Sequence, residues 1–335
     1  MVNYIAGEYM KILFVNSGRP RAFIGIQSSI INTLTKDFKY RVLEISPKQF
    51  MTGNIEDTFL PDIILVFYGI FVSAEKVLDA ARKGFKTILW TTEDPYQFDI
   101  YYQNTRKAYD YVFTNDLSTI PYYEKDKVFY IPACTDSKIY RPQKVKLKYK
   151  SDICIIGQGF PRRIKILNSI EKVLTRFNVK IIGKWDGWGE VLSPRLKRFV
   201  SSYVANPYEV AKYYNGAKIN INIHREWEDQ AIPYNHNSRN IKASSLNPRT
   251  FDISACGGFQ IVDNSREELS NFFEPDKQIV AFDINDYKEL GDKILFYLKN
   301  KKKRDEIRYS GYEQTVKNHT YIKRIKYLLD IVNSS

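Results

Sequence analysis

The sequence is short of the residues that build metal centres and covalent frameworks. Only three cysteines and three histidines occur among its 335 residues. Cys134, Cys154 and Cys256 are too few and too scattered for a disulfide framework or a structural zinc site. The histidines are equally scattered, and no paired Asp-x-Asp motif stands out between a strand and a loop. We therefore expect neither a disulfide-rich protein nor a metal centre.

Long apolar segments are also absent. The longest nearly apolar run, Ile63–Val72, is about half as long as a membrane-spanning helix. The segment Met1–Met10 lacks the basic start and the apolar stretch of a secretory signal. We therefore expect a soluble, cytoplasmic protein in which residues 1–9 form a loose extension.

Acidic residues are fewer than basic ones, 38 against 51, and the formal net charge is +13. The excess is uneven, because residues 1–145 carry +2 and residues 146–335 carry the other +11. A basic half can bind nucleic acid, an anionic membrane surface or a small phosphorylated ligand, or its lysines can simply cover solvated faces. The hydrophobic content of 44% excludes wholesale disorder.

The first half alternates short apolar runs with helical patterns. Lys11–Val15, Asp62–Phe67 and Lys86–Trp90 are typical of strands buried on both faces of a parallel sheet. Ser73–Lys83 has apolar residues at helical spacing. The pattern predicts a doubly wound α/β domain over residues 1–145, with ligands beyond the C-terminal ends of its strands.

A second α/β domain is expected after a linker. Lys138–Lys150 carries six basic residues and no acidic one, as solvated linkers often do. Strands such as Asp152–Ile156 and Lys218–His224 follow. We predict a second domain over residues 146–318 and a terminal helical segment over residues 319–335. The two Rossmann-like domains would face each other across a ligand-binding cleft.

The pattern NPRTFD is the most informative one for chemistry. Asn247 and Pro248 fit the N-cap and the first turn of a helix. Arg249 and Thr250 then lie beside free backbone N–H groups, where a diphosphate can bind. Asp252 follows near the same helical face and can accept hydrogen bonds from sugar hydroxyls. The alternative is that Asp252 only assists the helix dipole and Arg249 is a surface residue.

A second phosphate-binding pattern is Gly157 followed by Arg162 and Arg163 at the start of a helix. Glycine permits close approach of a ligand, and arginine can form paired hydrogen bonds with phosphate oxygens. No third glycine completes a dinucleotide fingerprint, so a turn before a solvated basic helix is the alternative. Trp185 and Trp188 could supply a flat surface for a base or sugar ring, or could pack the two domains together.

Polar residues also end the Lys218–His224 strand. Asn222 and His224 point to one face and Arg225 to the other. His224 could donate to a phosphate or a sugar hydroxyl and Arg225 could neutralise a diphosphate, although a lone histidine is more often structural.

Two adjacent carboxylates, Glu93 and Asp94, follow the Lys86–Thr91 strand. Either is a candidate general base for an acceptor hydroxyl, and Asp94 is preferred. Alternatively, Asp94 caps the helix that starts after Pro95.

These patterns resemble one family. The sequence looks like the spore-maturation CgeB-like group of GT-B glycosyltransferases, which is related to the group-1 glycosyltransferases. The resemblance covers most of the chain in the expected order. It is carried by RTFDISACGGFQIVDN (Arg249–Asn264), INIHR (Ile221–Arg225), NHTYIKRIKYLL (Asn318–Leu329), the IIG-then-RR pattern around Gly157, and TTEDPYQ (Thr91–Gln97).

The resemblance implies a nucleotide-diphosphate-sugar donor in the second domain and a glycan, protein or lipid acceptor at the first, without metal or cofactor. In similar enzymes the loop of Asn16, Gly18 and Arg19 lies nearest the transferred sugar, and the terminal helix braces the first domain. Asp252 matches the second carboxylate of a Glu-x7-Glu motif, which typically holds the ribose. The first falls on Ser244, so the motif is not intact and retention of the anomeric configuration is not implied.

The sequence thus predicts a cytoplasmic GT-B glycosyltransferase with at most peripheral membrane contact and no nucleic-acid partner. One rival is a sugar-nucleotide epimerase or hydrolase on the same scaffold, which would need no acceptor. The other is a basic nucleic-acid-binding or scaffold protein, whose binding would depend steeply on salt. No nucleic-acid module is recognisable, which disfavours the second rival.

Overall fold

The computed structural model describes residues 9–53, 59–105, 108–124, 126–187, 189–201, 206–229, 232–233 and 235–334. The extension expected over residues 1–9 lies, apart from Tyr9, outside these residues. The chain forms two compact units. Unit 1 consists of Met1–Pro132, Tyr234–Ala243 and Tyr321–Ser335, and unit 2 consists of Ala133–Pro233 and Ser244–Thr320.

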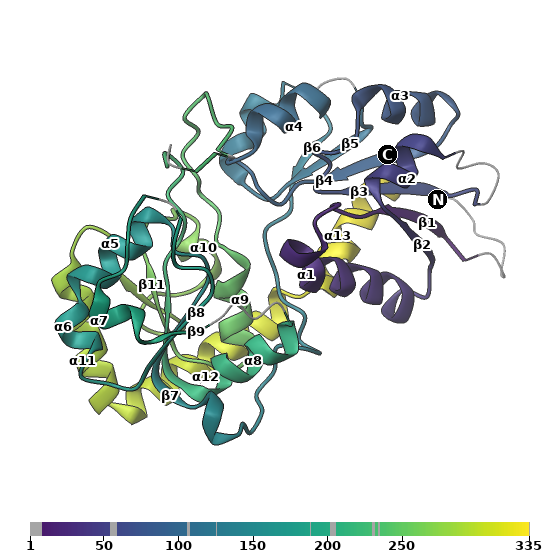
Figure 1. Ribbon diagram of the computed structural model, residues 1–335. Helices are drawn as coiled ribbons and strands as arrows, with labels where there is room; N and C mark the ends of the chain where they lie inside the picture. Colours follow the sequence, from purple (N-terminus) through teal and green to yellow (C-terminus); the bar gives the residue numbers. More distant parts are fainter. Residues whose placement is uncertain are drawn as a thin grey trace. The chain divides into compact units, whose positions relative to one another are not determined.

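Unit 1 is built on a six-stranded parallel sheet (Figure 1). The strands are β1 (Lys11–Val15), β2 (Arg41–Ile45), β3 (Ile63–Phe67), β4 (Lys86–Trp90), β5 (Tyr111–Thr114) and β6 (Val128–Tyr130). Every residue of β3 is buried, as its continuous apolar sequence predicts. The order is β2-β1-β3-β4-β5-β6, so the chain direction across the sheet reverses between β1 and β3. Sheets of this kind bind ligands at such a reversal.

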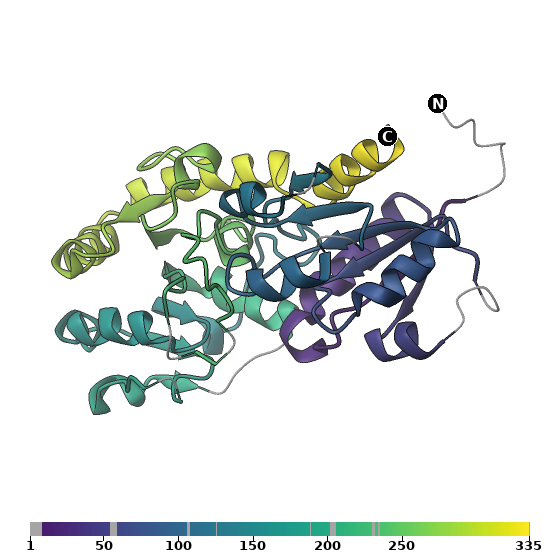
Figure 2. The same cartoon turned by 90° about the horizontal axis from the view of Figure 1, so that it is seen from above.

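Helices cover both faces of this sheet. They are α1 (Pro20–Asn32), α2 (Pro47–Thr52), α3 (Ala74–Arg82), α4 (Phe98–Thr105) and α13 (Tyr321–Asn333), with the shorter turns η1 (Thr33–Asp37) and η3 (Leu117–Tyr122). Within unit 1, α3 and α4 lie on one face and α1 and α13 on the other, as Figures 1 and 2 show. The buried stripe of α13, which includes Ile325, Leu328 and Val332, packs in unit 1 near α1 and η1. The end of the chain therefore returns to the unit in which it begins.

Unit 1 also includes the segment Tyr234–Ala243, although unit 2 holds the residues on either side of it. The N–H of His236 donates to the carbonyl of Tyr96 (2.7 Å), and the N–H of Asp99 donates to the carbonyl of His236 (2.9 Å). Ser238 donates to the Asp99 carboxylate from both its N–H (2.8 Å) and its hydroxyl (2.9 Å). These bonds attach the segment to the start of α4.

Unit 2 repeats the architecture with a second six-stranded parallel sheet. Its strands are β7 (Ser151–Ile156), β8 (Val179–Ile182), β9 (Val200–Ser201), β10 (Ala217–Asn222), β11 (Gln260–Asp263) and β12 (Val280–Phe282). The order is β12-β11-β10-β7-β8-β9, which reverses between β7 and β10. The predicted α/β class with two doubly wound sheets is confirmed.

The helices of unit 2 bury apolar stripes against the two faces of its sheet. They are α5 (Pro161–Ser169), α6 (Glu171–Leu174), α7 (Pro194–Lys197), α8 (Pro207–Gly216), α9 (Pro248–Ala255), α10 (Leu269–Phe272), α11 (Tyr287–Lys299) and α12 (Lys301–Asn318). One core cluster joins α5, α6 and α11 to the strands, and another joins α8 to α9. The helix predicted to begin at Pro248 is thus present, and the basic stretch expected as a linker lies within unit 2, where it includes the turn η4 (Leu147–Tyr149).

A buried glycine in α12 provides a test of this packing. A Cβ atom on Gly311 would overlap the backbone carbonyl of Gln278, whereas one on Gly291 of α11 would meet Val173 at 3.4 Å, an ordinary contact. Alanine favours helix over glycine by about 1 kcal/mol. We expect Gly291→Ala to preserve or raise the free energy of unfolding and Gly311→Ala to lower it by about 1–3 kcal/mol, because overpacking cannot be relieved at a backbone atom. Urea denaturation measures both variants, and equal stabilities would contradict the packing described.

Candidate functional site

The reversal between β7 and β10 gathers most of the donor-binding residues predicted from the sequence. Gly157 follows β7, Asn222 ends β10, and α9 begins at Pro248. Because parallel strands end at one edge of a sheet, these three segments meet. The predicted residues joined there by contacts are Gly157, Arg163, Asn222, His224, Arg225, Arg249 and Thr250.

Two arginines share one backbone acceptor at this edge. The carbonyl oxygen of Ile223 accepts from Arg163 Nε (2.8 Å) and from Arg249 Nη2 (3.1 Å). Gly157 lies beside both, because a Cβ atom there would be 3.2 Å from each Nη1 atom. Its φ of +152° is also one that side-chain-bearing residues rarely adopt. The absent side chain thus lets two positive groups meet beside half-buried backbone, which suits an anionic ligand.

The N-terminus of α9 is tied to the same cluster. Asn247 caps the helix, since its Oδ1 accepts the N–H of Thr250 (3.2 Å). Asn222 Oδ1 accepts from Asn247 Nδ2 (3.0 Å) and from Arg249 Nε (3.3 Å), and Asn222 Nδ2 donates to Thr250 Oγ1 (2.9 Å). A buried asparagine therefore sets both the helix end and the arginine beside it.

His224 is 2% exposed and makes specific contacts on both ring nitrogens. Its Nδ1 lies 2.9 Å from Asp263 Oδ2, which also accepts the backbone N–H of His224 (2.6 Å). Its Nε2 accepts the backbone N–H of Asn247 (3.2 Å). Burial lowers the pKa of His224 to about 4, whereas His224 and Arg266 outweigh burial and hold the pKa of Asp263 below its usual range. The pair is a neutral imidazole donating to a carboxylate.

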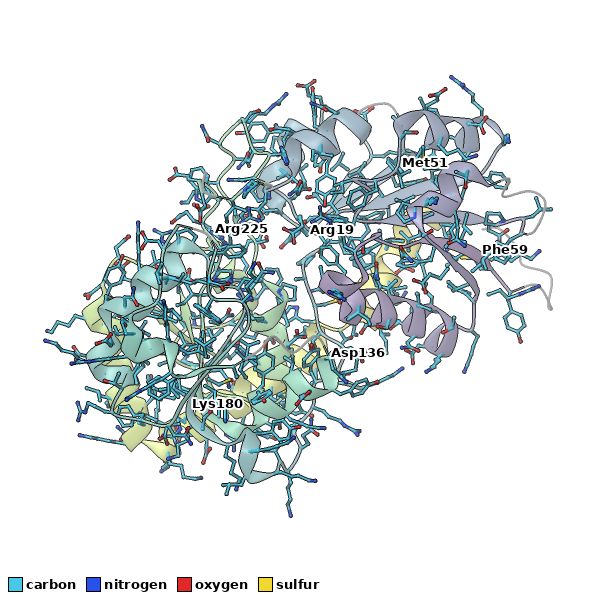
Figure 3. All side chains as sticks on the ribbon, in the orientation of Figure 1. Arg19, Met51, Phe59, Asp136, Lys180 and Arg225 are labelled. Atoms are coloured by element: carbon cyan, nitrogen blue, oxygen red, sulfur yellow. The ribbon has the colours of Figure 1, made fainter. Side chains whose placement is uncertain are left out.

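Further cations surround the cluster. Arg225 lies over the ring of Phe160, 5.1 Å from its centroid, and the carbonyl of Arg225 accepts from Arg266 Nη2. Figure 3 labels Arg225 in unit 2. Arg162 is partly exposed and forms an ion pair with Glu226 (2.5 Å).

Three of these residues, Glu226, Asp263 and Arg266, were not among the candidates taken from the sequence. Each lies at or just after the end of a buried apolar strand, and this position could have marked it as a candidate.

Trp185 does not take the role expected of it. Its side chain is 4% exposed and packs in the core of unit 2. Gly159 permits this packing, since a Cβ atom there would lie 2.7 Å from the Cα of Trp185. The ring therefore has no open face on which a base could stack, and the other tryptophan, Trp188, lies outside the described residues.

Asp252, predicted to bind sugar hydroxyls, points toward the start of unit 2. Its Oδ1 accepts from Thr135 Oγ1 (2.8 Å). Burial and the nearby Asp136 raise the pKa of this carboxyl well above its usual range, although Thr135 and Arg249 partly oppose the shift. Ser244, at the position of the absent first carboxylate, donates to Glu268 Oε1 (3.2 Å).

The predicted acceptor-side loop lies at the reversal of unit 1. Asn16 Oδ1 accepts the N–H of Gly18 (3.0 Å), whose φ of +67° turns the chain. The guanidinium of Arg19 lies over the rings of Tyr68 (5.7 Å) and Phe71 (5.3 Å), which follow β3. Tyr68 is buried and Phe71 is exposed, so only the Phe71 ring can form a surface with this loop. Figure 3 labels Arg19 in unit 1.

Asp94 is 1% exposed, and its carboxyl faces hydroxyl groups of its own unit. Its Oδ2 accepts from Thr91 (2.9 Å), Thr114 (2.7 Å) and Tyr123 (2.7 Å), whereas its Oδ1 has no partner among the described residues. Burial raises the pKa of Asp94 from an ordinary 3.8 to about 6. Helix α4 begins at Phe98, so Asp94 precedes it by four positions. Glu93 is partly exposed.

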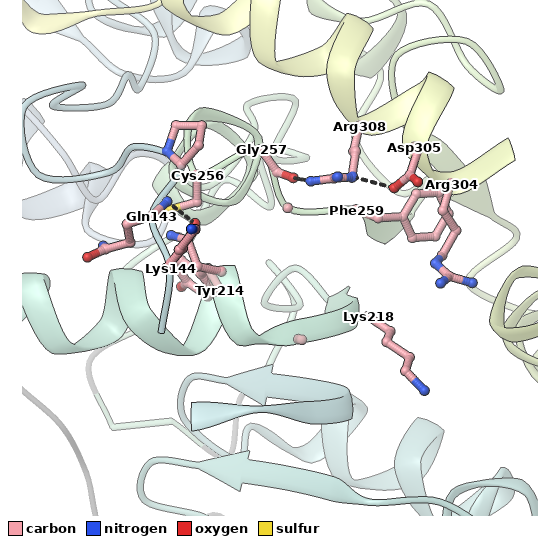
Figure 4. Close-up of a pocket in the computed structure, with 14 residues that line it drawn as sticks. Gln143, Lys144, Tyr214, Lys218, Cys256, Gly257, Phe259, Arg304, Asp305 and Arg308 are labelled. Atoms are coloured by element: carbon pink, nitrogen blue, oxygen red, sulfur yellow. Dashed lines mark hydrogen bonds and ion pairs between the residues drawn. The ribbon is translucent and has the colours of Figure 1, made fainter. Parts of the chain in front are cut away.

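A cavity of about 550 Å³ lies away from this cluster, beside the start of β10 (Figure 4). Its walls include Arg304, Arg308 and Lys218. Arg308 donates to the carbonyl of Gly257 (2.9 Å), just after α9, and Arg304 donates to the carbonyl of Leu298 (3.0 Å) near the end of α11. Cations at helix C-termini offset the helix dipole, so these arginines have a structural explanation.

Neither a metal centre nor a membrane-spanning helix is found among the described residues. These residues contain no group of three or more His, Cys, Asp or Glu side chains arranged to hold a metal ion. Among the same residues, every helix is too short or too polar to span a bilayer.

The raised pKa of Asp94 predicts how stability depends on pH. The folded state binds this proton more tightly than the unfolded chain, so the contribution of Asp94 is greatest below about pH 4 and is lost as the pH rises through 6. Relative to Asp94→Asn, the wild-type free energy of unfolding should fall by up to about 3 kcal/mol between about pH 4 and pH 7. Urea denaturation at several pH values measures this difference. Asp79→Asn, at a half-exposed surface carboxyl of α3, serves as a control. A difference for Asp94→Asn that does not vary with pH would contradict the prediction.

Comparison with known proteins identifies the family. Residues 162–330 match a family described as glycosyl transferase-like. The spore protein CgeB of Bacillus subtilis (strain 168) is 30% identical over 326 residues, which cover 93% of this chain and 95% of CgeB.

Similar folds occur among solved structures. Sucrose-phosphate synthase from Thermosynechococcus elongatus superposes with a TM-score of 0.66 at 10% identity, covering 97% of this chain and 98% of that one. An alpha-glucosyltransferase solved with UDP and a 13-mer DNA containing a HMU base gives 0.68 at 12% identity, covering 97% and 100%. With its two doubly wound units and these relatives, the chain belongs to the CgeB-like family of GT-B glycosyltransferases.

Proposed function

We propose that this glycosyltransferase takes its sugar from a nucleotide-diphosphate-sugar and that the cluster at the β7 and β10 edge binds the diphosphate. The observation that carries this proposal is the meeting of Arg163 and Arg249 on the carbonyl of Ile223 beside Gly157. A guanidinium has five N–H donors, so it can hold a backbone carbonyl and a phosphate oxygen together. The UDP bound by the alpha-glucosyltransferase of similar fold agrees with such a donor.

The other residues of the cluster have supporting roles in this proposal. Thr250 lies in the first turn of α9, where backbone N–H groups and the helix dipole favour an anion. Arg162 and Arg225 bring further positive charge. Asp252 would hold the ribose and would leave its bond to Thr135 to do so.

No metal ion is assigned a role in the proposal. The leaving nucleoside diphosphate gains negative charge as the glycosidic bond breaks, and preorganised cations can stabilise that charge. Arginine side chains remain positively charged at physiological pH, so Arg163 and Arg249 can supply this stabilisation without a cofactor.

The acceptor side is proposed in unit 1. Asn16, Gly18 and Arg19 would line the acceptor beside the exposed ring of Phe71. Of the two candidate bases, Glu93 is the partly exposed one, and a base must come within hydrogen-bond reach of the acceptor hydroxyl. Asp94 would instead position the segment that follows β4, which contains Glu93, through its buried hydroxyl partners.

The donor site is tested by nucleotide binding. We expect calorimetry with UDP, GDP and dTDP, each with and without its sugar, to detect at least one ligand in the presence of EDTA, and CMP, which has a single phosphate, to bind more weakly. Arg249→Ala should weaken that ligand roughly 10–100-fold, because a charge-assisted hydrogen bond contributes about 1.5–3 kcal/mol. Arg195→Ala is the matched control, since Arg195 is a largely exposed arginine of α7 paired with Glu171. Binding unaffected by Arg249→Ala, or lost on adding EDTA, would contradict the proposal.

The ribose assignment has a separate test. Asp252→Ala should weaken binding of the nucleoside diphosphate several-fold and leave binding of inorganic pyrophosphate unchanged, since pyrophosphate has no ribose. Parallel titrations with the two ligands measure the difference. An equal loss for both would place Asp252 at the phosphates instead, and no loss for either would remove it from the site.

A further inference from the structure

A chain of buried and partly buried hydrogen bonds connects Asp263 at the end of β11 to Arg249 on α9. Asp263 accepts from His224 Nδ1 (2.9 Å), and His224 Nε2 accepts the N–H of Asn247 (3.2 Å). Asn247 Nδ2 then donates to Asn222 Oδ1 (3.0 Å), which also accepts from Arg249 Nε (3.3 Å). The chain of contacts ends at one of the two guanidinium groups of the candidate diphosphate site.

The histidine has one possible state in this arrangement. Asp263 carries an ionised carboxyl, which can only accept hydrogen bonds. Its Oδ2 accepts the backbone N–H of His224 and also the N–H at Nδ1 of the ring. Nε2 must then present its lone pair, because the group it faces is the N–H of Asn247. Arg249 and Arg266 lie near enough to oppose a positive charge on the ring, as does its burial.

The position of the ring excludes direct contact with a ligand. His224 is 2% exposed and Asp263 is fully buried. Both ring nitrogens are occupied by protein groups. Of the two roles considered for His224 from the sequence, donation to a phosphate or sugar hydroxyl is excluded and the structural role remains, because its Nε2 accepts a hydrogen bond and carries no proton to donate.

The backbone N–H that the ring accepts belongs to the N-cap residue of α9. That N–H lies before the first helical turn, and a buried donor without an acceptor costs about 1–3 kcal/mol. Accepting it holds Asn247 in place. Asn247 in turn caps Thr250 and bonds to Asn222, so a shift of Asn247 would move the helix N-terminus and release one contact that orients Arg249.

We propose that His224 and Asp263 are positioning residues, which hold the α9 N-terminus and Arg249 in the geometry that binds the donor diphosphate. This inference rests on the proposed function. It assigns His224 neither phosphate binding nor acid–base catalysis.

The tautomer is tested without any ligand. Nitrogen-15 NMR of the three histidine rings, assigned with His224→Asn, His236→Asn and His319→Asn, reports which ring nitrogen carries the proton. We expect His224 to be protonated at Nδ1 and bare at Nε2 from about pH 6 to pH 8. The opposite tautomer, or a charged ring, would overturn the proposal.

The positioning role is tested by two substitutions that each preserve half of the ring. The amide nitrogen of His224→Asn takes the place of Nδ1 and preserves the donor to Asp263, but it leaves Asn247 without an acceptor. The amide oxygen of His224→Gln reaches the place of Nε2 and preserves that acceptor. We expect the dissociation constant of the best-binding of UDP, GDP and dTDP to rise about tenfold in His224→Asn and less than threefold in His224→Gln. His236→Asn, at an exposed histidine of unit 1, should not change it.

Thermal unfolding of the same variants separates positioning from general destabilisation. The proposal would be overturned if the loss of nucleotide affinity in each variant were proportional to its loss of melting temperature. It would also be overturned if His224→Asn and wild type had equal affinity. If His224→Asn does not fold, Asp263→Asn replaces it. Oδ2 of Asp263 accepts from His224 and Oδ1 accepts from Ser265, whereas an amide has only one acceptor oxygen and must give up one of these bonds. Unchanged affinity in Asp263→Asn would overturn the proposal equally. If no nucleotide binds wild type, the proposed function fails and this inference fails with it. Wild-type binding with an unaffected His224→Asn refutes this inference alone.

Discussion

The candidate site depends on one contact, the acceptance of two guanidinium groups by the carbonyl oxygen of Ile223. Two like charges near each other repel, and burial strengthens that repulsion. The cost is offset by backbone and amide oxygens, which include those of Gln158 and Asn222. An anion placed there relieves the remaining repulsion and meets donors that need no rearrangement. The glycine after β7, the asparagine that ends β10 and the capped N-terminus of α9 all serve this arrangement.

The charge of the site comes from arginine and not from histidine. His224 is kept neutral by burial, and Asp263 stays ionised beside it. Arginine does not lose its proton in proteins, so the positive potential of the cluster is constant over the physiological pH range. The net charge of +13 is a poor guide to this site, because most lysines are exposed and several form surface ion pairs of small energetic value.

Much of the fold and part of the site could be predicted from the sequence. Continuous apolar runs marked buried strands such as β3, and Asn247 followed by Pro248 marked the start of α9. Arg249 and Gly157 were found because their local patterns suit a phosphate. The ligand-binding role considered for Trp185 does not fit its burial in a core, and the sequence could not decide this, since a tryptophan after a strand looks the same in sequence whether it lines a ligand or fills a core. The polar segment around Ser238 has its partner, Asp99, 139 positions away, so no local pattern shows that it belongs to unit 1.

The sequence by itself determined the α/β class, the strand and helix positions, and the residue types able to hold a diphosphate, because these follow from local periodicity, capping and side-chain chemistry. Only the tertiary structure decided which polar groups face one another. It brought Asp263 to His224 and Arg163 to Arg249, and it buried Asp94 among hydroxyl groups. The physical reason is that hydrogen bonding and desolvation act between atoms that are near in space, and the order of strands in a sheet is not written in any single segment.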